Sequence, residues 1–175
     1  MKHEIKNKPD YASLHVFLDS GEQVVTEAGA MMGMSGGLEM KSNMQGGLMA
    51  AAKRAIGGES IFLNTYTATA DGQRLDVAPA APGDMVHIPL SGGAVMVQSG
   101  SFCASTPGVT VDSKWGGAKT FFGGEGLVML RCHGQGDLWV SSYGAIHAVE
   151  VDGSYTVDLN SCLLYTSDAA DEWIG

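Results

Sequence analysis

The sequence predicts an all-β protein, a pseudo-repeat barrel or double-stranded β-helix with one short helix near residues 48–56. Three observations indicate this fold. The chain has 25 glycines but only 5 prolines, its apolar runs are short and bounded by turn residues, and one motif recurs along it. The motif is a glycine turn followed by an alternating strand that closes on a polar residue. Its copies cover residues 21–30, 92–101 and 152–160, closing on Glu27, Gln98 and Asp158.

A second repeat is interleaved with the first. Gly57–Ser60 precedes an apolar strand that starts at Ile61, and Gly123–Gly126 precedes a similar strand that starts at Leu127. Glycine-rich turns are common in any β-protein. Two motifs that recur in the same order indicate internal duplication and a pseudosymmetric β-structure.

The expected elements follow from local patterns. We expect strands at 14–18 and 23–27 and a loop over 33–47. Leu48, Ala52 and Ile56 lie four residues apart in an alanine-rich stretch flanked by glycine pairs, which predicts a short helix over 48–56. From Ser60 onward the pattern is typical of short strands and turns. The expected strands are 60–69, 73–78, 85–90, 94–98, 101–105, 108–112, 118–122, 126–133, 137–142 and 145–151.

The sequence changes character after Asn160. We expect one β-domain over residues 1–160 that lacks most of its third repeat. Residues 163–172 look like translated sequencing-adapter read-through, so we interpret 161–175 as an artefactual tail. An unclosed repeat leaves unpaired strand edges, which favour association with another chain, including a second copy of this one.

The composition restricts the classes of function that this protein can have. The formal net charge of −9 and the isoelectric point near 4.8 argue against nucleic-acid binding, which needs clustered Lys and Arg. No secretory signal or long apolar run is apparent. Three cysteines, Cys103, Cys132 and Cys162, lack metal-site spacing and predict buried, reduced thiols. We expect a cytoplasmic protein, either free or peripheral to a membrane.

The residues show no set that carries chemistry. A cupin-like metal site would need clustered histidines, but the five histidines contain no His-x-His pair, although His87 and His147 could meet in the fold. The Gly57–Ser60 turn lacks the Gly-Lys-Ser/Thr ending of a phosphate loop. Glu59 and Glu125 are expected on separate repeats, too far apart for paired acid–base work. We therefore expect no catalytic, cofactor-binding or metal-binding residues.

Methionine is concentrated in one segment. Six methionines fall between Met31 and Met49, and methionine suits adaptable binding surfaces. With the helix expected at 48–56 and its Lys53-Arg54 pair, the segment could dock on a membrane or a partner. The alternative, which we favour, is a loop and helix that cover the β-core.

The ordered motifs resemble the altered-inheritance-of-mitochondria family, whose bacterial members are mostly uncharacterised. The residues that carry the resemblance are Gly21-Glu22, Glu27–Met31, Gly57–Ser60 with Phe62, Pro82–Asp84, Gly100–Ala104, Gly124–Leu127, Gly144 and Val157-Asp158. The resemblance implies a fold like that of the tryptophan RNA-binding attenuator protein, with three pseudo-repeats around an axis. It also implies further strands after Val157-Asp158, where this chain has Leu159-Asn160 instead of a Gly-His-type turn.

The resemblance implies a non-enzymatic binding or scaffold protein with a protein or membrane partner, because mitochondrial relatives are tied to inner-membrane organisation. Two alternatives stay open. A cupin-like small-ligand or metal-dependent enzyme would show stoichiometric metal that is lost on changing His87 or His147 to Ala. An RNA-binding protein, disfavoured by the acidic charge, would show RNA binding that survives physiological salt.

Overall fold

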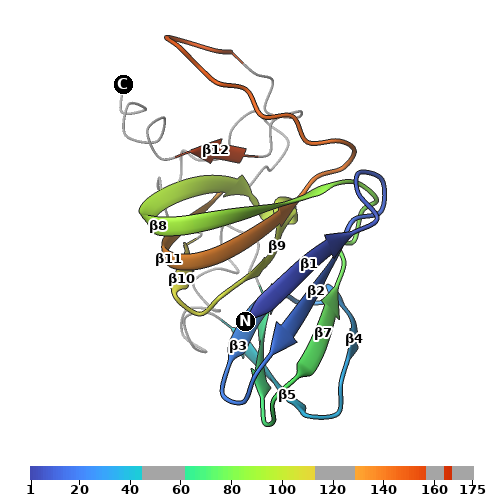
Figure 1. Ribbon diagram of the computed structural model, residues 1–175. Coiled ribbons are helices and arrows are strands. Elements are labelled where there is room, and N and C mark those ends of the chain that lie inside the picture. Colours follow the sequence, from blue (N-terminus) through green and yellow to red (C-terminus); the bar gives the residue numbers. More distant parts are fainter. Residues whose placement is uncertain (45–61, 113–128, 157–163, 167–175) are drawn as a thin grey trace.

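The computed structural model describes residues 1–44, 62–112, 129–156 and 164–166. These residues form strands almost throughout (Figure 1). The elements are β1 (Lys2–Lys6), β2 (Ser13–Leu18), β3 (Gln23–Glu27), β4 (Met31–Met34), β5 (Leu38–Met44), β6 (Phe62–Ala68), β7 (Gln73–Val77), β8 (Met85–Gln98), the 3₁₀ turn η1 (Ser99–Ser101), β9 (Phe102–Ser105), β10 (Val109–Asp112), β11 (Met129–Ser141) and β12 (Leu164–Thr166).

The strands form two antiparallel sheets. The smaller sheet has the order β1-β2-β7-β4. The larger has the order β12-β8-β11-β9-β3-β6-β5, with β10 also paired to β11. The long strands β8 and β11 curve strongly, so the larger sheet curls while the smaller sheet stands beside it (Figure 1). This architecture confirms the prediction of an all-β, barrel-like fold.

Two hydrophobic clusters stabilise the sheets. The first lies between the sheets and includes Leu14, Val16 and Leu18, which occupy every second position of β2, together with Trp139 of β11. The second, which includes Phe102 and Leu130, belongs to the curled sheet alone. Burying each such side chain contributes about 1.5–3 kcal/mol.

Strand β3 belongs to both clusters. Val24 and Thr26 are fully buried, and Val24 is part of the first cluster. Val25 points to the opposite face and packs against the second cluster. Successive side chains of a strand point to opposite faces, so a strand with apolar residues at consecutive positions can serve two cores. This placement of Val25 positions the candidate site described below.

Local patterns located several strands correctly. The expected strands 14–18 and 23–27 correspond to β2 and β3. The loop expected over 33–47 is wrong for its described part, because β4 ends at Met34 and β5 runs from Leu38 to Met44 and pairs with β6 throughout. Its glycines and serines mask the strand signal, and pairing with a neighbour supplies what propensity lacks. The helix expected at 48–56 lies outside the described residues.

Two expected turns are instead bends within long strands. The segments 85–90 and 94–98 form one strand, β8, and residues 129–141 form one strand, β11. In β11 the pairing with β8 shifts between His133 and Gln135, which marks a bulge. Gly134 and Gly136 there have φ of +121° and +145°. Glycine in a strand interior marks such bulges as well as turns.

Other differences lie near the ends of the chain. Residues 145–151 form no strand, contrary to expectation, while β1 pairs with β2 although no strand was expected there. The expected strand 118–122 lies outside the described residues.

The repeat copies share local geometry in their described parts. β3 and β8 end at Glu27 and Gln98, as the motif predicts. Gly21, Gly92 and Gly153 all have positive φ, a conformation that glycine adopts without strain. Internal duplication stays a prediction, because the third copy continues beyond the described residues.

Candidate functional site

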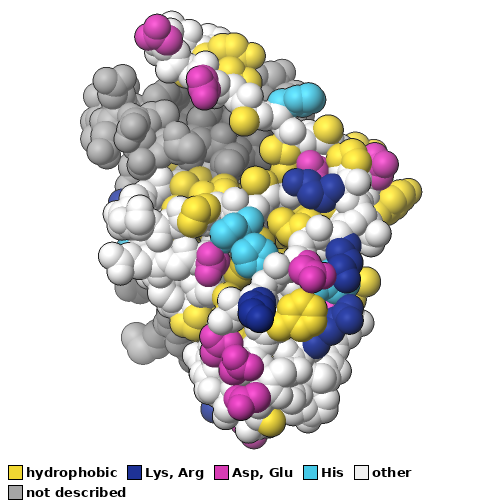
Figure 2. All heavy atoms as spheres, viewed as in Figure 1, with side chains coloured by type: hydrophobic (Ala, Val, Ile, Leu, Met, Phe, Trp, Pro, Cys, Tyr) yellow, Lys and Arg dark blue, Asp and Glu magenta, His cyan; other side chains and the backbone are white. Residues whose placement is uncertain are grey.

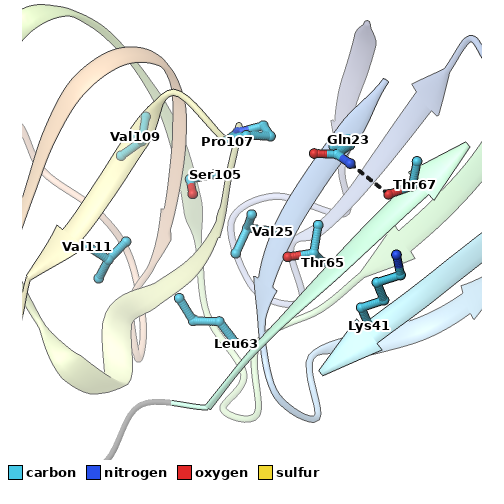
Figure 3. A pocket seen from close by; sticks show the side chains of 10 residues that line it. All are labelled: Gln23, Val25, Lys41, Leu63, Thr65, Thr67, Ser105, Pro107, Val109 and Val111. Atoms are coloured by element: carbon cyan, nitrogen blue, oxygen red, sulfur yellow. Dashed lines mark hydrogen bonds between the residues drawn. The ribbon is translucent and has the colours of Figure 1, made fainter. Parts of the chain in front are cut away.

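A pocket of about 340 Å³ opens between β10 and the strands β3, β5 and β6 (Figure 3). Its size lies at the lower end of the range of about 300–1,000 Å³ that is typical of small-molecule sites. The lining residues are Gln23, Val25, Lys41, Leu63, Thr65, Thr67, Ser105, Pro107, Val109 and Val111.

The floor of the pocket is a row of residues across four neighbouring strands. Ser105 of β9 pairs in register with Val25 of β3, Val25 pairs with Thr65 of β6, and Thr65 pairs with Lys41 of β5. Neighbouring strands lie about 4.8 Å apart, so this cross-strand row spans about 14 Å. It runs from the fully buried Ser105 to the exposed Lys41.

The apolar side of the pocket comes mainly from β10. Val109 and Val111 are buried and face Val25 and Leu63 across the pocket (Figure 3). On the polar side, Gln23 Nε2 donates a hydrogen bond of 2.9 Å to Thr67 Oγ1. The pocket therefore has an apolar body flanked by hydroxyl and amide groups.

The Ser105 hydroxyl is the most unusual group in the pocket. Its oxygen is inaccessible to solvent and has no hydrogen-bond partner among the described residues. A buried polar group left without a partner costs about 1–3 kcal/mol. Ser105 is one of the lining residues, so rotation about its χ1 angle would present the unused donor and acceptor to a molecule bound there.

A cluster of histidines, distinct from the pocket and from the two hydrophobic clusters, joins the two sheets. His3 of β1 and His87 of β8 have ring centroids 4.3 Å apart, and both rings contact the buried Trp139 of β11. His87 Nε2 lies 2.6 Å from Asp137 Oδ1. Figure 2 shows adjoining histidine side chains near the middle of the face in view. The cluster links β1 to the long strands of the curled sheet.

Acidification should weaken this link through His3. Burial and the neighbouring His87 lower the pKa of His3, against a smaller opposite effect of Asp137. Because this pKa is lower in the folded protein, the unfolded chain binds the proton more tightly. The contribution of His3 to the free energy of unfolding is therefore complete above about pH 6.5, where His3 is neutral in both states, and it is lost as the pH falls below that value. We expect His3→Gln to flatten the decrease of the melting temperature between about pH 7.5 and pH 5.5.

The matched control is His147→Gln, because His147 is exposed. Thermal unfolding of both variants and the parent across this pH range is the measurement. An unchanged pH dependence in His3→Gln would contradict the role assigned to His3.

A polar cluster on the smaller sheet has the sequence of contacts found in a Ser-His-Asp triad. Ser13 Oγ lies 3.1 Å from His15 Nε2, and His15 Nδ1 lies 2.6 Å from Asp76 Oδ1. Arg74, however, places a terminal nitrogen 2.8 Å from the same Nδ1. Nδ1 cannot donate to Asp76 and accept from Arg74 at once. Ser13 is also buried, so we interpret the cluster as structural.

The charge of Asp76 is stabilised within that cluster. Burial by itself would raise the pKa of Asp76, but hydrogen bonds from Arg74 and His15, together with their charges, outweigh it and lower the pKa. Arg74 Nε donates to Asp76 Oδ1 at 2.7 Å. The carboxylate is therefore held ionised by two cationic or hydrogen-bonding neighbours.

The residues considered in the sequence have varied placements. His87 contacts His3 and Asp137, whereas His147 is exposed. In the part of the chain that the structure describes, no group of three or more His, Cys, Asp or Glu side chains could hold a metal ion. Glu59, Ser60 and Glu125 lie outside that part.

Two of the three cysteines fall within the described residues. Cys103 and Cys132 are free and buried, as predicted, and burial raises the pKa of each thiol to about 12. A nearby Glu27 adds to the effect at Cys103. Only the thiolate is a good nucleophile, so both thiols are unreactive at neutral pH. Cys162 lies outside the described residues.

The pocket could not be predicted from the sequence. Its floor joins residues of β3, β5, β6 and β9, whose register across the sheet cannot be read from local patterns. The one local signal is the alternation of β6, which places Leu63, Thr65 and Thr67 on the same face.

These features define the chain as an all-β protein with a curled sheet and a small pocket beside it. The family model described as "Mitochondrial biogenesis AIM24" matches residues 3–170. The chain belongs to this family, which confirms the resemblance seen in the sequence.

Two similar proteins come from Streptococcus pyogenes. An uncharacterised protein of serotype M6 is 26% identical over 168 residues, covering 90% of this chain and 67% of the relative. A crystal structure of a protein from the same species has a TM-score of 0.77 and 22% identity, covering 94% of this chain and 76% of that one. The likeness to the crystal structure supports the fold. Among the described residues, no helix has the length and apolarity needed to cross a membrane.

Proposed function

We propose that this chain is a non-enzymatic binding protein that takes a small molecule into the pocket above the cross-strand row. The observation that carries the proposal is the Ser105 hydroxyl, which belongs to a residue that lines the pocket, is fully buried and has no partner in the described part of the chain. Buried polar groups in proteins are nearly always hydrogen-bonded. A bound molecule would supply the missing partner.

The chemistry of the lining supports binding rather than catalysis. The lining residues contribute hydroxyls, one amide and one amine, but no histidine, carboxylate or thiol. A Ser or Thr nucleophile needs a neighbouring base, and the one titratable side chain of the lining, Lys41, lies at the opposite end of the cross-strand row from Ser105. The valines and Leu63 provide the apolar contact area that predominates in small-molecule sites.

Filling the pocket should weaken the binding of small molecules. We expect a mixed library of neutral, cationic and anionic small molecules to shift the methyl resonances of Val25, Val109 and Val111 in NMR spectra. Thr65→Phe places a ring in the pocket, so we expect binding of each hit to weaken at least tenfold, about 1.4 kcal/mol. The variant should fold, because aromatic residues suit strands.

The control is Thr110→Phe, which lies between the two pocket valines of β10 but is exposed and so points away. This variant should bind as the parent does. A library without any hit at these methyl groups, or hits that bind Thr65→Phe as tightly as the parent, would overturn the proposal.

We also propose a scaffold or membrane role, which rests on the resemblance of the sequence motifs alone. It predicts flotation of the purified protein with liposomes at low salt. Exposed methionines at Met31, Met32, Met34 and Met40 would offer an adaptable apolar surface for such contacts. The cupin-like and RNA-binding alternatives keep the tests stated above.

A further inference from the structure

We propose that the ligand of this pocket is a small aliphatic monocarboxylate with a neutral oxygen acceptor at the end away from its carboxylate. The inference rests on the proposed function and names the class of molecule that the same pocket recognises. The two ends and the middle of the cross-strand row each require a different part of that molecule.

The buried end requires a neutral acceptor. Ser105 Oγ is enclosed and has no partner among the described residues, and its register neighbour Val25 is apolar. A ketone or hydroxyl oxygen of the ligand would accept a hydrogen bond from this hydroxyl. A carboxylate there would lie in an apolar environment without a compensating cation, which is far more costly.

The middle of the pocket requires an aliphatic chain. Val25 and Leu63 lie on one side, and Val109 and Val111 lie on the other (Figure 3). These branched side chains contribute stabilisation in proportion to the apolar area that a ligand removes from water. The pocket volume of about 340 Å³ restricts the ligand to a short chain.

The open end requires one negative charge. Lys41 lines the pocket at the exposed end of the row. Within the ranges that the structure describes, its ammonium group makes no ion pair. Glu39 lies two residues away on the same face of β5 and pairs in register with Thr67. A single carboxylate can approach Lys41, whereas a dianion would be repelled by Glu39.

The test uses three probes of equal chain length. Octanoate has the carboxylate alone, methyl hexyl ketone has the acceptor alone, and the oxo-octanoate whose ketone adjoins the terminal methyl group has both. Calorimetric or NMR titration of the full chain should show that the oxo-octanoate binds about tenfold more tightly than octanoate, as expected for one buried hydrogen bond.

Two variants separate the ends of the site. Ser105→Ala removes a hydroxyl that has no partner among the described residues, so the variant should fold, and we expect it to bind octanoate and the oxo-octanoate equally. Lys41→Met keeps a long side chain, and we expect it to weaken the binding of both carboxylates several-fold without changing the affinity for methyl hexyl ketone. Lys6→Met, on the exposed face of β1, is the control and should bind all three probes as tightly as the parent does.

The outcomes distinguish this inference from the proposed function. Equal binding of octanoate and the oxo-octanoate to the parent, or a preference that survives Ser105→Ala, overturns the assigned ligand class. Library hits at the pocket methyl groups without any carboxylate binding also overturn the ligand class while supporting the binding function. A pocket that binds neither the probes nor any library member contradicts both.

Discussion

Gly83→Ala is expected to lower the free energy of unfolding by at least about 3 kcal/mol, the upper end of typical overpacking costs. Gly83 lies where three segments of the chain meet, because it forms bridges with Tyr11 and with Gly144. A Cβ atom there would lie 1.8 Å from the carbonyl oxygen of Ser142 and 2.6 Å from the amide nitrogen of Gly144. Both contacts are with backbone, which cannot rotate away.

The same substitution would strain neighbouring hydrogen bonds. The Gly83 carbonyl accepts a bond of 2.9 Å from Ala12 N, and Asp84 N donates to the Gly144 carbonyl at 2.9 Å. These bonds connect the start of β2, the start of β8 and the end of β11. Moving the backbone of Ser142 and Gly144 to admit a methyl group would lengthen them together.

Urea denaturation of Gly83→Ala and Gly36→Ala is the measurement. Gly36 has a φ outside the left-handed region, and no atom of the described residues lies within 4 Å of the position that a Cβ atom would take there. Its replacement should therefore leave the midpoint nearly unchanged. Equal midpoints for the two variants would show that the junction at Gly83 is looser than described.

Trp139→Ala is expected to cost about 3–5 kcal/mol, the usual range for removing a large buried aromatic side chain. Trp139 is fully buried in the cluster between the sheets and contacts both His3 and His87. Its removal leaves a cavity at the place where β1, β8 and β11 meet. For a chain of this length, the melting temperature should fall by about 6–20 °C.

Two companion variants make the experiment specific. Tyr143→Ala removes an aromatic side chain that is 81% exposed, so its stability should match that of the parent. Trp139→Phe should cost less than Trp139→Ala, because the indole nitrogen has no hydrogen-bond partner to lose within the described ranges. A cost below about 1 kcal/mol for Trp139→Ala would refute the packing assigned to this residue.

Local sequence determined the class of fold and several strands. Short apolar runs bounded by turn residues identified β2 and β3, and in β2 one buried face has apolar residues at every second position. The ordered motifs identified the family, and the burial of Cys103 and Cys132 followed from the general behaviour of free cysteine. These features depend on a residue and its near neighbours in the chain.

The tertiary structure decided which glycines turn the chain and which residues meet. Gly134 and Gly136 have the pattern of a turn, but pairing with β8 carries β11 through them as a bulge. Ser105 and Lys41 belong to one pocket only because β9, β3, β6 and β5 align in a single register. His3 meets His87 because one strand of the smaller sheet packs against the larger. Register and sheet packing are set by long-range contacts, which no local pattern encodes.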